Sequence, residues 1–183
     1  MKVGAYLFEV NGYLSPGEMD ISVDEFFSLF VINSQFNKSK KRTKQFAEFM
    51  TFVKILNNLG LIDGLTKIII DGSFCSSKNN PNDIDIFIYY DVASTVSSKL
   101  EYQIDLTKTT LKRKGLHIVS FRDFSNQNPD MIDQVKLRLD QLSRKEFERY
   151  FSHTKDNVSK GYVVINRENL RLGGEQNVIA TNA

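Results

Sequence analysis

Two short apolar runs separated by a polar loop constrain the fold more than any other stretch of this sequence. The first run is residues 68–70, followed by a Gly-Ser pair, and the second is residues 83–90, in which Asp83 and Asp85 alternate with apolar residues. Both runs are rich in β-branched residues and bounded by turn residues, which is typical of strands. Because side chains at i and i+2 share one face of a strand, Asp83 and Asp85 point the same way while the isoleucines between and after them point into a core.

The two aspartates predict a metal site. Neighbouring carboxylates repel each other, so a cation or a proton must offset their charge. Mg²⁺ usually takes one or two carboxylate ligands and completes its shell with water and substrate phosphates. Gly72 lets the backbone approach a phosphate closely, and Ser73 adds a hydroxyl donor. The alternative is a hairpin whose exposed face carries two aspartates with no function.

Taken together, Gly72-Ser73, the loop and Asp83-Ile84-Asp85 resemble the motif of the DNA polymerase beta-like nucleotidyltransferase superfamily. Further short pieces are similar to a prokaryotic family of nucleotidyltransferase-like proteins; they lie at residues 14–17, 71–74, 81–85 and 160–165. The resemblance implies transfer of a nucleoside monophosphate from an NTP to a hydroxyl acceptor. It also implies that Asp83 and Asp85 hold Mg²⁺ or Mn²⁺ while Gly72 and Ser73 orient the nucleotide.

The sequence departs from the superfamily pattern at the third carboxylate. That group usually comes from a later strand and helps to hold the metal that activates the attacking hydroxyl. The matching strand is residues 116–121, and its central polar residue is His117. Histidine can ligate a metal, but Mg²⁺ prefers oxygen, so His117 is either a catalytic residue or a polar residue on an open strand face. Asp123 is a substitute if the strand bends, whereas Asp105 falls on a predicted helix.

Basic residues outside this motif are further candidates for phosphate binding. Lys160 precedes an apolar strand and Lys78 lies in the loop between the motif halves; the alternative for Lys160 is a lysine that faces solvent. Residues 37–45 lead into a long helix predicted from about Lys40, and basic side chains at a helix N-terminus oppose the helix macrodipole. This conflict indicates either phosphate binding or a solvated polar end. The basic side chains of this segment are Lys38, Lys40, Lys41, Arg42 and Lys44.

Two functions of different classes stay open at this point. The first is an enzyme that uses an NTP and transfers its nucleotide to a protein side chain, an RNA 3′ end or a small molecule. The second is a catalytically degenerate module that binds a nucleotide or a partner, such as an antitoxin or a regulatory component. The missing third carboxylate favours the second function. The retained aspartate pair favours the first, because a module that never binds metal has no physical need for it.

The pattern of elements predicts an α/β (α+β) fold, a small mixed sheet with helices packed chiefly on one face. Strands are expected near residues 67–71, 83–90, 116–121 and 161–165, and residues 3–10 form a short strand or an extended arm. Ser22 and Glu25 have capping-box spacing ahead of a short helix. The predicted helices are residues 23–30, 40–59, 91–114, 131–142 and 143–151. Residues 1–166 are expected to form the nucleotidyltransferase-like domain, with an N-terminal helical segment, and residues 167–183 a tail.

The composition of the chain predicts a cytoplasmic protein. The single cysteine, Cys75, excludes an intramolecular disulfide and fits a reducing compartment. No apolar stretch approaches the length needed to span a bilayer, and the N-terminal residues make a poor signal peptide. The net charge of +2 gives no overall field that selects a partner.

Overall fold

The fold is a five-stranded mixed sheet with helices on both faces. The computed structural model describes residues 7–128, 130, 133–154 and 156–170. The sheet has the order β1-β5-β2-β3-β4. β1 is parallel to β5 and β3 is parallel to β4, whereas β2 is antiparallel to β3 and β5. The strands are β1 (Gly17–Asp20), β2 (Leu65–Asp71), β3 (Ile84–Asp91), β4 (Leu116–Asp123) and β5 (Gly161–Asn166). The predicted α/β fold is confirmed, and the predicted central strands lie in one sheet.

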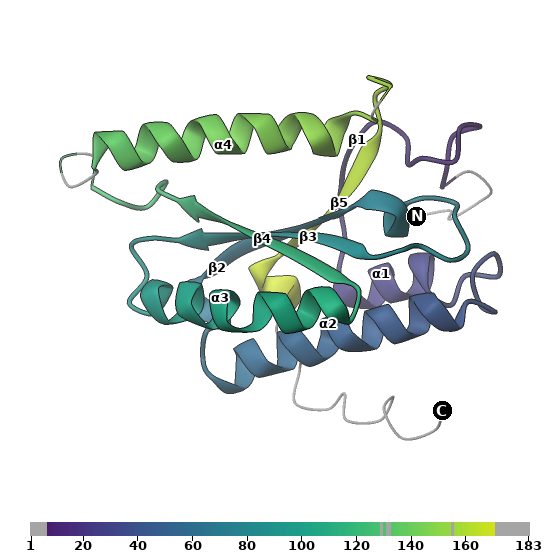
Figure 1. Ribbon diagram of the computed structural model, residues 1–183, viewed down its shortest axis with the longest axis horizontal. Helices are drawn as coiled ribbons and strands as arrows, with labels where there is room; N and C mark the ends of the chain where they lie inside the picture. Colours follow the sequence, from purple (N-terminus) through teal and green to yellow (C-terminus); the bar gives the residue numbers. More distant parts are fainter. Residues whose placement is uncertain (1–6, 129, 131–132, 155, 171–183) are drawn as a thin grey trace.

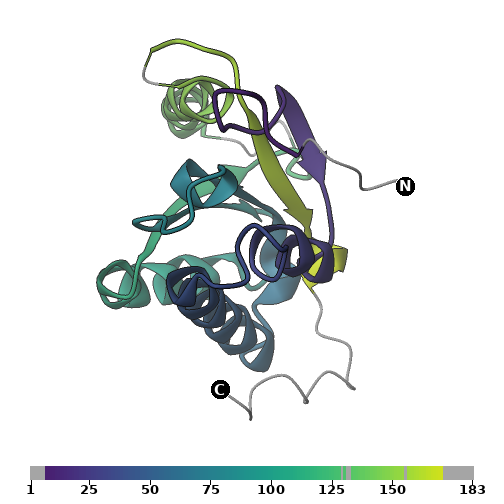
Figure 2. The same ribbon diagram turned by 90° about the vertical axis from the view of Figure 1, so that its right-hand side faces the viewer.

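The helices divide unequally between the two faces of the sheet. α1 (Val23–Phe30), α2 (Lys40–Asn58) and α3 (Ser97–Arg113) cover one face, and α4 (Gln134–Ser152) lies across the other (Figures 1 and 2). The prediction that the helices pack chiefly on one face therefore holds for α1, α2 and α3, whereas α4 packs on the opposite face. Short 3-10 helices complete the connections, among them η1 (Ile62–Gly64), η2 (Gly72–Cys75) and η4 (Arg167–Leu170).

Alternation along β3 gives the sheet a separate core on each face. Ile84, Ile86 and Ile88 join the larger cluster, which also contains the phenylalanines of α1 and α2. Phe87 belongs to the smaller cluster, where its ring centroid lies 4.1 Å from that of Phe151 in α4. Because Asp85 has the same parity as Phe87, its side chain lies on the α4 face, opposite the isoleucines as predicted.

The N-terminal half of the chain holds one confirmed cap and one strand that was not predicted. The capping box of α1 forms, with Glu25 N donating to Ser22 Oγ at 3.2 Å and Ser22 N donating to Glu25 Oε2 at 2.8 Å. β1 escaped prediction because its four residues, GEMD, are mostly exposed and have no apolar alternation. Of the expected strand at 3–10, Phe8 forms an isolated bridge with Leu14, and residues 1–6 lie outside the described residues.

Two predicted helix boundaries were wrong. α3 begins at Ser97, because residues 91–96 form a turn that Asp91 Oδ1 stabilises by accepting a bond from Ala93 N at 2.8 Å. The two helices expected within residues 131–151 form the single helix α4, since no glycine or proline interrupts the segment. Within the described residues, no helix is both long and apolar enough to cross a membrane.

Candidate functional site

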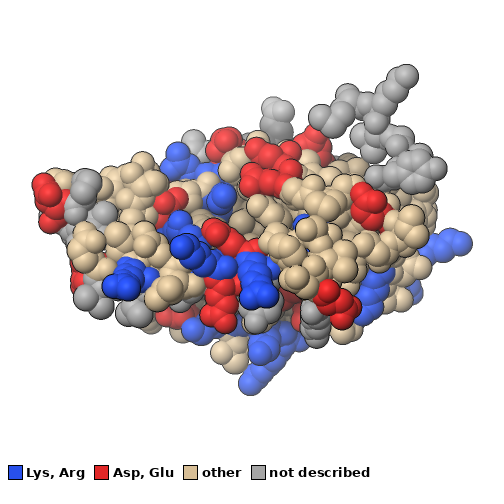
Figure 3. Space-filling model, turned by 90° about the horizontal axis from the view of Figure 1, so that it is seen from above, with Lys and Arg blue, Asp and Glu red and all other residues tan. Residues whose placement is uncertain are grey.

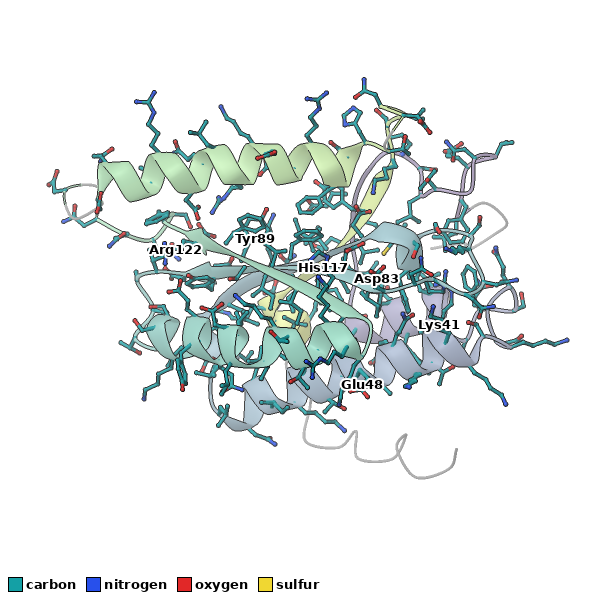
Figure 4. The ribbon with its side chains drawn as sticks, in the orientation of Figure 1. Lys41, Glu48, Asp83, Tyr89, His117 and Arg122 are labelled. Atoms are coloured by element: carbon teal, nitrogen blue, oxygen red, sulfur yellow. The ribbon has the colours of Figure 1, made fainter. Side chains whose placement is uncertain are left out.

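The residues of the predicted motif meet at the end of the sheet where β2 ends and β3 and β4 begin. Asp71 is paired with Asp85 across β2 and β3, and Asp85 is paired with His117 across β3 and β4. Residues directly opposite each other in a ladder project to the same face, so these three side chains form a row on the α4 face. Asp83 lies just before β3, and Figure 4 shows Asp83 and His117 beneath α4.

Gly72 brings the turn after β2 directly against Asp85. Its φ is +77°, and a Cβ added to it would lie 2.0 Å from Asp85 Oδ2. Only glycine fits both the left-handed backbone and this approach. The neighbouring Ser73 Oγ accepts a hydrogen bond from Asn82 N at 3.2 Å, which connects the turn to the residue before Asp83. The hydroxyl proton of Ser73 is left to donate to a ligand.

The Asp85 carboxylate is held in an environment that disfavours its charge. Burial raises its pKa, and the nearby charge of Asp83 raises it further. His117 acts in the opposite direction, with Nδ1 lying 3.1 Å from Asp85 Oδ1. The His117 ring is about half exposed, so this compensation is partial. A divalent cation at the carboxylate pair would offset the remaining repulsion.

Lys160 is buried and forms an ion pair with Asp71. Its Nζ donates to Asp71 Oδ2 at 2.5 Å, and both residues are less than a tenth exposed. Burial raises the pKa of Asp71 to about 6 against the lowering effect of Lys160. The alternative of a solvent-facing lysine at the start of β5 is therefore wrong. In this structure the ammonium group faces Asp71, and the ion pair joins the start of β5 to the end of β2.

Arg42 has a role that neither interpretation of the basic segment predicted. Its side chain is fully buried, and burial lowers its pKa to about 10. The guanidinium carbon lies 3.8 Å from the centroid of the Phe36 ring. Its N–H groups donate to four backbone carbonyls, those of Phe30, Phe74, Ser76 and Lys78. Arg42 thus fixes the loop between the two halves of the motif.

Sequence reasoning also missed Gln45, and the signals for both residues were weak. Gln45 is buried on α2, and its Nε2 donates to the carbonyl of Asn82 at 2.8 Å. It therefore positions the residue that precedes Asp83. The one signal for Arg42 was an arginine within a run of lysines, because a planar guanidinium suits several fixed acceptors better than an ammonium does.

Neither substitute for the third carboxylate reaches the site. Asp123 is paired with Asp91 at the opposite end of β4 from His117, which is roughly 20 Å along the strand. Figure 4 shows the neighbouring Arg122 at that far end. Asp105 lies on α3, as predicted, and pairs with Lys108 at 2.7 Å. His117 therefore stands alone at the position opposite Asp85.

Lys78 and Cys75 differ in exposure. The Lys78 side chain faces solvent, although its backbone carbonyl accepts from Arg42. The thiol of Cys75 is buried and donates to the carbonyl of Ile70 at 3.4 Å. Seen from the α4 side, acidic and basic side chains are intermingled over the surface (Figure 3).

The donor set fits a cation that is bound together with a substrate. Within the described residues, no three His, Cys, Asp or Glu side chains are arranged to hold a metal ion. The Asp83–Asp85 pair offers two carboxylates, so phosphates and water would have to supply the other ligands. Mg²⁺ binds with one or two carboxylates in this manner.

The comparisons with known proteins identify a family. Residues 7–166 match the family of unknown function DUF6932, and the chain belongs to it. Neither the curated proteins nor the solved structures contained a match to the chain. The function must therefore be argued from the site itself.

Proposed function

We propose that this protein is a nucleotidyltransferase of the DNA polymerase beta-like superfamily, with its site at the adjoining ends of β2, β3 and β4. The observation that carries the proposal is the Gly72 turn packed against Asp85. A left-handed glycine, a serine hydroxyl and a carboxylate pair thereby meet where the end of β2 adjoins the start of β3. The proposal goes beyond family membership, because the function of the matching family is unknown. It relies on the resemblance of the motif to that of the superfamily.

Each residue of the site has a distinct proposed role. Asp83 and Asp85 hold Mg²⁺ or Mn²⁺, which when bound would neutralise phosphate charge. Ser73 donates its hydroxyl proton to a phosphate oxygen, and Gly72 provides the space for that approach. Lys160 positions β5 against β2 through Asp71, whereas the exposed Lys78 can reach a phosphate directly.

His117 is suited to accept a proton from the attacking hydroxyl. When Nδ1–H donates to Asp85, the neutral ring carries its free lone pair on Nε2. The acceptor oxygen forms a bond to the α-phosphorus of the NTP, and the bond to the pyrophosphate oxygen breaks. The hydroxyl proton passes to Nε2 and the leaving electrons go to pyrophosphate. Positioning and charge neutralisation supply the rest of the catalysis.

A second candidate is a nucleotide-binding or partner-binding module without activity, such as an antitoxin or a regulatory component. His117 at the position opposite Asp85 favours it, as does the lack of any three-ligand group within the described residues. In that case the hydrogen bond between His117 and Asp85 would serve only to stabilise the fold, with no part in a reaction. The nucleotide would bind and leave unchanged.

Calorimetry and a transfer assay separate the two candidates. ATP with Mg²⁺ or Mn²⁺ should bind the native chain and bind Asp83→Asn/Asp85→Asn at least tenfold more weakly. ATP labelled at the α-phosphate should label an acceptor, and His117→Ala should abolish that labelling because no base remains. His117→Asp should raise the labelling only if an oxygen ligand is what the site lacks.

Asp105→Asn/Asp156→Asn is the charge-matched control, because both aspartates are exposed and lie outside the site. It should bind ATP as the native chain does. Equal binding by the native chain and by Asp83→Asn/Asp85→Asn would refute the metal site. Tight binding without transfer, unchanged by His117→Ala and His117→Asp, would establish the inactive module instead.

A further inference from the structure

Five lysines form an exposed patch beside the candidate site, called here the lysine patch. All five side chains are exposed, and none forms an ion pair among the described residues. They come from the start of α2 and from the loop ahead of β3. The members are Lys38, Lys40, Lys41, Lys44 and Lys78.

The lysine patch is unfavourable for the isolated chain. The first turn of α2 contains no acidic residue, so its lysines oppose the helix macrodipole without compensation. Lys44 lies one helical turn from both Lys40 and Lys41, at spacings where like charges destabilise a helix. An external anion would remove both penalties.

Polar donors accompany the lysines. A pocket of about 330 Å³ opens beside Lys38 and is lined by serine, asparagine and glutamine side chains, including Ser39, Asn79 and Asn80. Lysines combined with hydroxyl and amide groups are the side chains that contact nucleic-acid phosphates. Large exposed apolar residues are what a protein interface needs at its centre. Near the lysine patch Ile32 is one such residue, whereas a group of them lies near the far end of α2 and on α3: Ile55, Leu59, Tyr102 and Leu106.

The lysine patch is rigidly connected to the site. Ser39 Oγ donates to the carbonyl of Asn79 at 2.6 Å, and Arg42 holds the carbonyl of Lys78. Gln45, one turn further along α2, holds the carbonyl of Asn82. Figure 4 shows Lys41 at the same end of the molecule as Asp83 and away from Arg122. The lysine patch and the proposed reaction centre therefore lie at the same end of the sheet, and a bound chain passes around this end to reach the α4 face.

We propose that the lysine patch binds the phosphodiester backbone of a nucleic acid, which presents its terminal hydroxyl to the site. The binding itself rests on the lysines alone. Only its role as acceptor rests on the proposed function. Because the contacts are to phosphate, recognition is independent of base sequence and depends strongly on salt.

Fluorescence anisotropy with a labelled single-stranded RNA, without NTP or metal, tests the binding. Lys40→Gln/Lys41→Gln/Lys44→Gln should weaken binding about tenfold or more near physiological salt. The slope of log Kd against the logarithm of salt concentration should also fall by about 2, because each phosphate neutralised on a single strand contributes about 0.7 and three lysines are removed. The same variant should melt at a higher temperature, since its removal of like charges relieves α2.

Lys54→Gln/Lys99→Gln/Lys145→Gln is the matched control, because it removes three exposed lysines elsewhere. It should bind RNA as the native chain does. An equal loss in the control, a lower melting temperature in the lysine-patch variant, or displacement of RNA by poly-glutamate at equal charge would overturn the proposal. Single-stranded DNA bound as tightly as RNA identifies the backbone as the ligand, and tighter RNA binding adds the 2′-hydroxyl.

Asp83→Asn/Asp85→Asn separates this inference from the proposed function. It should retain full RNA binding, since the aspartates contact no lysine of the patch. Loss of transfer with retained binding is the expected pattern if both proposals hold. Binding that follows the lysine patch in a protein without transfer activity would refute the proposed function alone.

Discussion

The two ends of the β3–β4 ladder carry similar residues and use them differently. At one end Asp85 faces His117, and at the other Asp91 faces Asp123. Asp91 accepts bonds from Ala93 N at 2.8 Å and Asn126 Nδ2 at 2.9 Å, and Asp123 accepts from Ser125 N at 3.1 Å. The carboxylates of the second end are thus occupied in holding turns.

The pKa values of the aspartates at the two ends are shifted in opposite directions. Burial has the largest single effect and works to raise the pKa of Asp123, but the hydrogen bonds from Ser125 and the charge of Arg144 act together against it, and the pKa is lowered. At the first end burial raises the pKa of Asp85, and Asp83 adds to the effect. An acidic pair in a ladder is therefore not in itself a site. What makes a candidate site is a carboxylate whose charge the protein leaves uncompensated.

Neutralising each end in turn should produce opposite results. Asp83→Asn/Asp85→Asn should lower nucleotide transfer by about a hundredfold or more, because it removes the charge that holds the metal. It should leave the melting temperature unchanged or raised, since it relieves repulsion. Transfer assays and thermal unfolding measure the two effects.

Asp91→Asn/Asp123→Asn is the comparison. It should leave transfer within about twofold and destabilise the fold by about 1–3 kcal/mol, because turn hydrogen bonds are lost. The contrast between the two ends fails if both double variants lose transfer to the same degree.

A pair of glycine substitutions sharpens the comparison. Gly72→Ala and Gly60→Ala both place a side chain at positive φ, but only the Gly72 Cβ meets another residue within 4 Å. Each should cost about 1–2 kcal/mol of unfolding free energy through backbone strain. Only Gly72→Ala should also weaken metal-dependent ATP binding, by about tenfold, because it pushes the Asp85 carboxylate from its position. Calorimetry on both variants would contradict this if their affinities were equal.

The smallest effect concerns pH. A raised native pKa, as for Asp85, contributes stability that is present below the unfolded pKa of about 3.9 and lost as pH rises. A lowered one, as for Asp123, contributes stability that is present above that pKa and lost as pH falls.

Across the range from about pH 2 to 7, the stability of the native chain relative to Asp85→Asn should therefore fall as the pH rises above about 4, whereas its stability relative to Asp123→Asn should rise with pH up to about 4 and then stay level. Each change should stay below about 1 kcal/mol, since both groups are partly exposed. Denaturant unfolding across this range measures both, and slopes of the same sign would contradict the assignment.

Local pattern was sufficient for much of the fold and for the centre of the site. Alternation along residues 83–90 correctly separated Asp85 from the isoleucines, and the Ser22 capping box set the start of α1. β1 could not be found this way, because a short exposed edge strand has no apolar period and is defined by pairing with β5. The continuity of α4 was missed because the prediction divided the segment between residues 142 and 143, where the helix in fact continues.

The sequence by itself determined strands β2 to β5, the turn chemistry of Gly72 and the face on which Asp85 lies, because these follow from periods of two residues and from backbone sterics. Only the tertiary structure decided which residues meet across strands: that His117 lies opposite Asp85, that Asp123 lies at the far end, and that Lys160 is paired with Asp71. It alone showed that Arg42 is buried while its lysine neighbours remain exposed. The physical reason is that register and burial depend on contacts between residues far apart in the chain, which no local pattern contains.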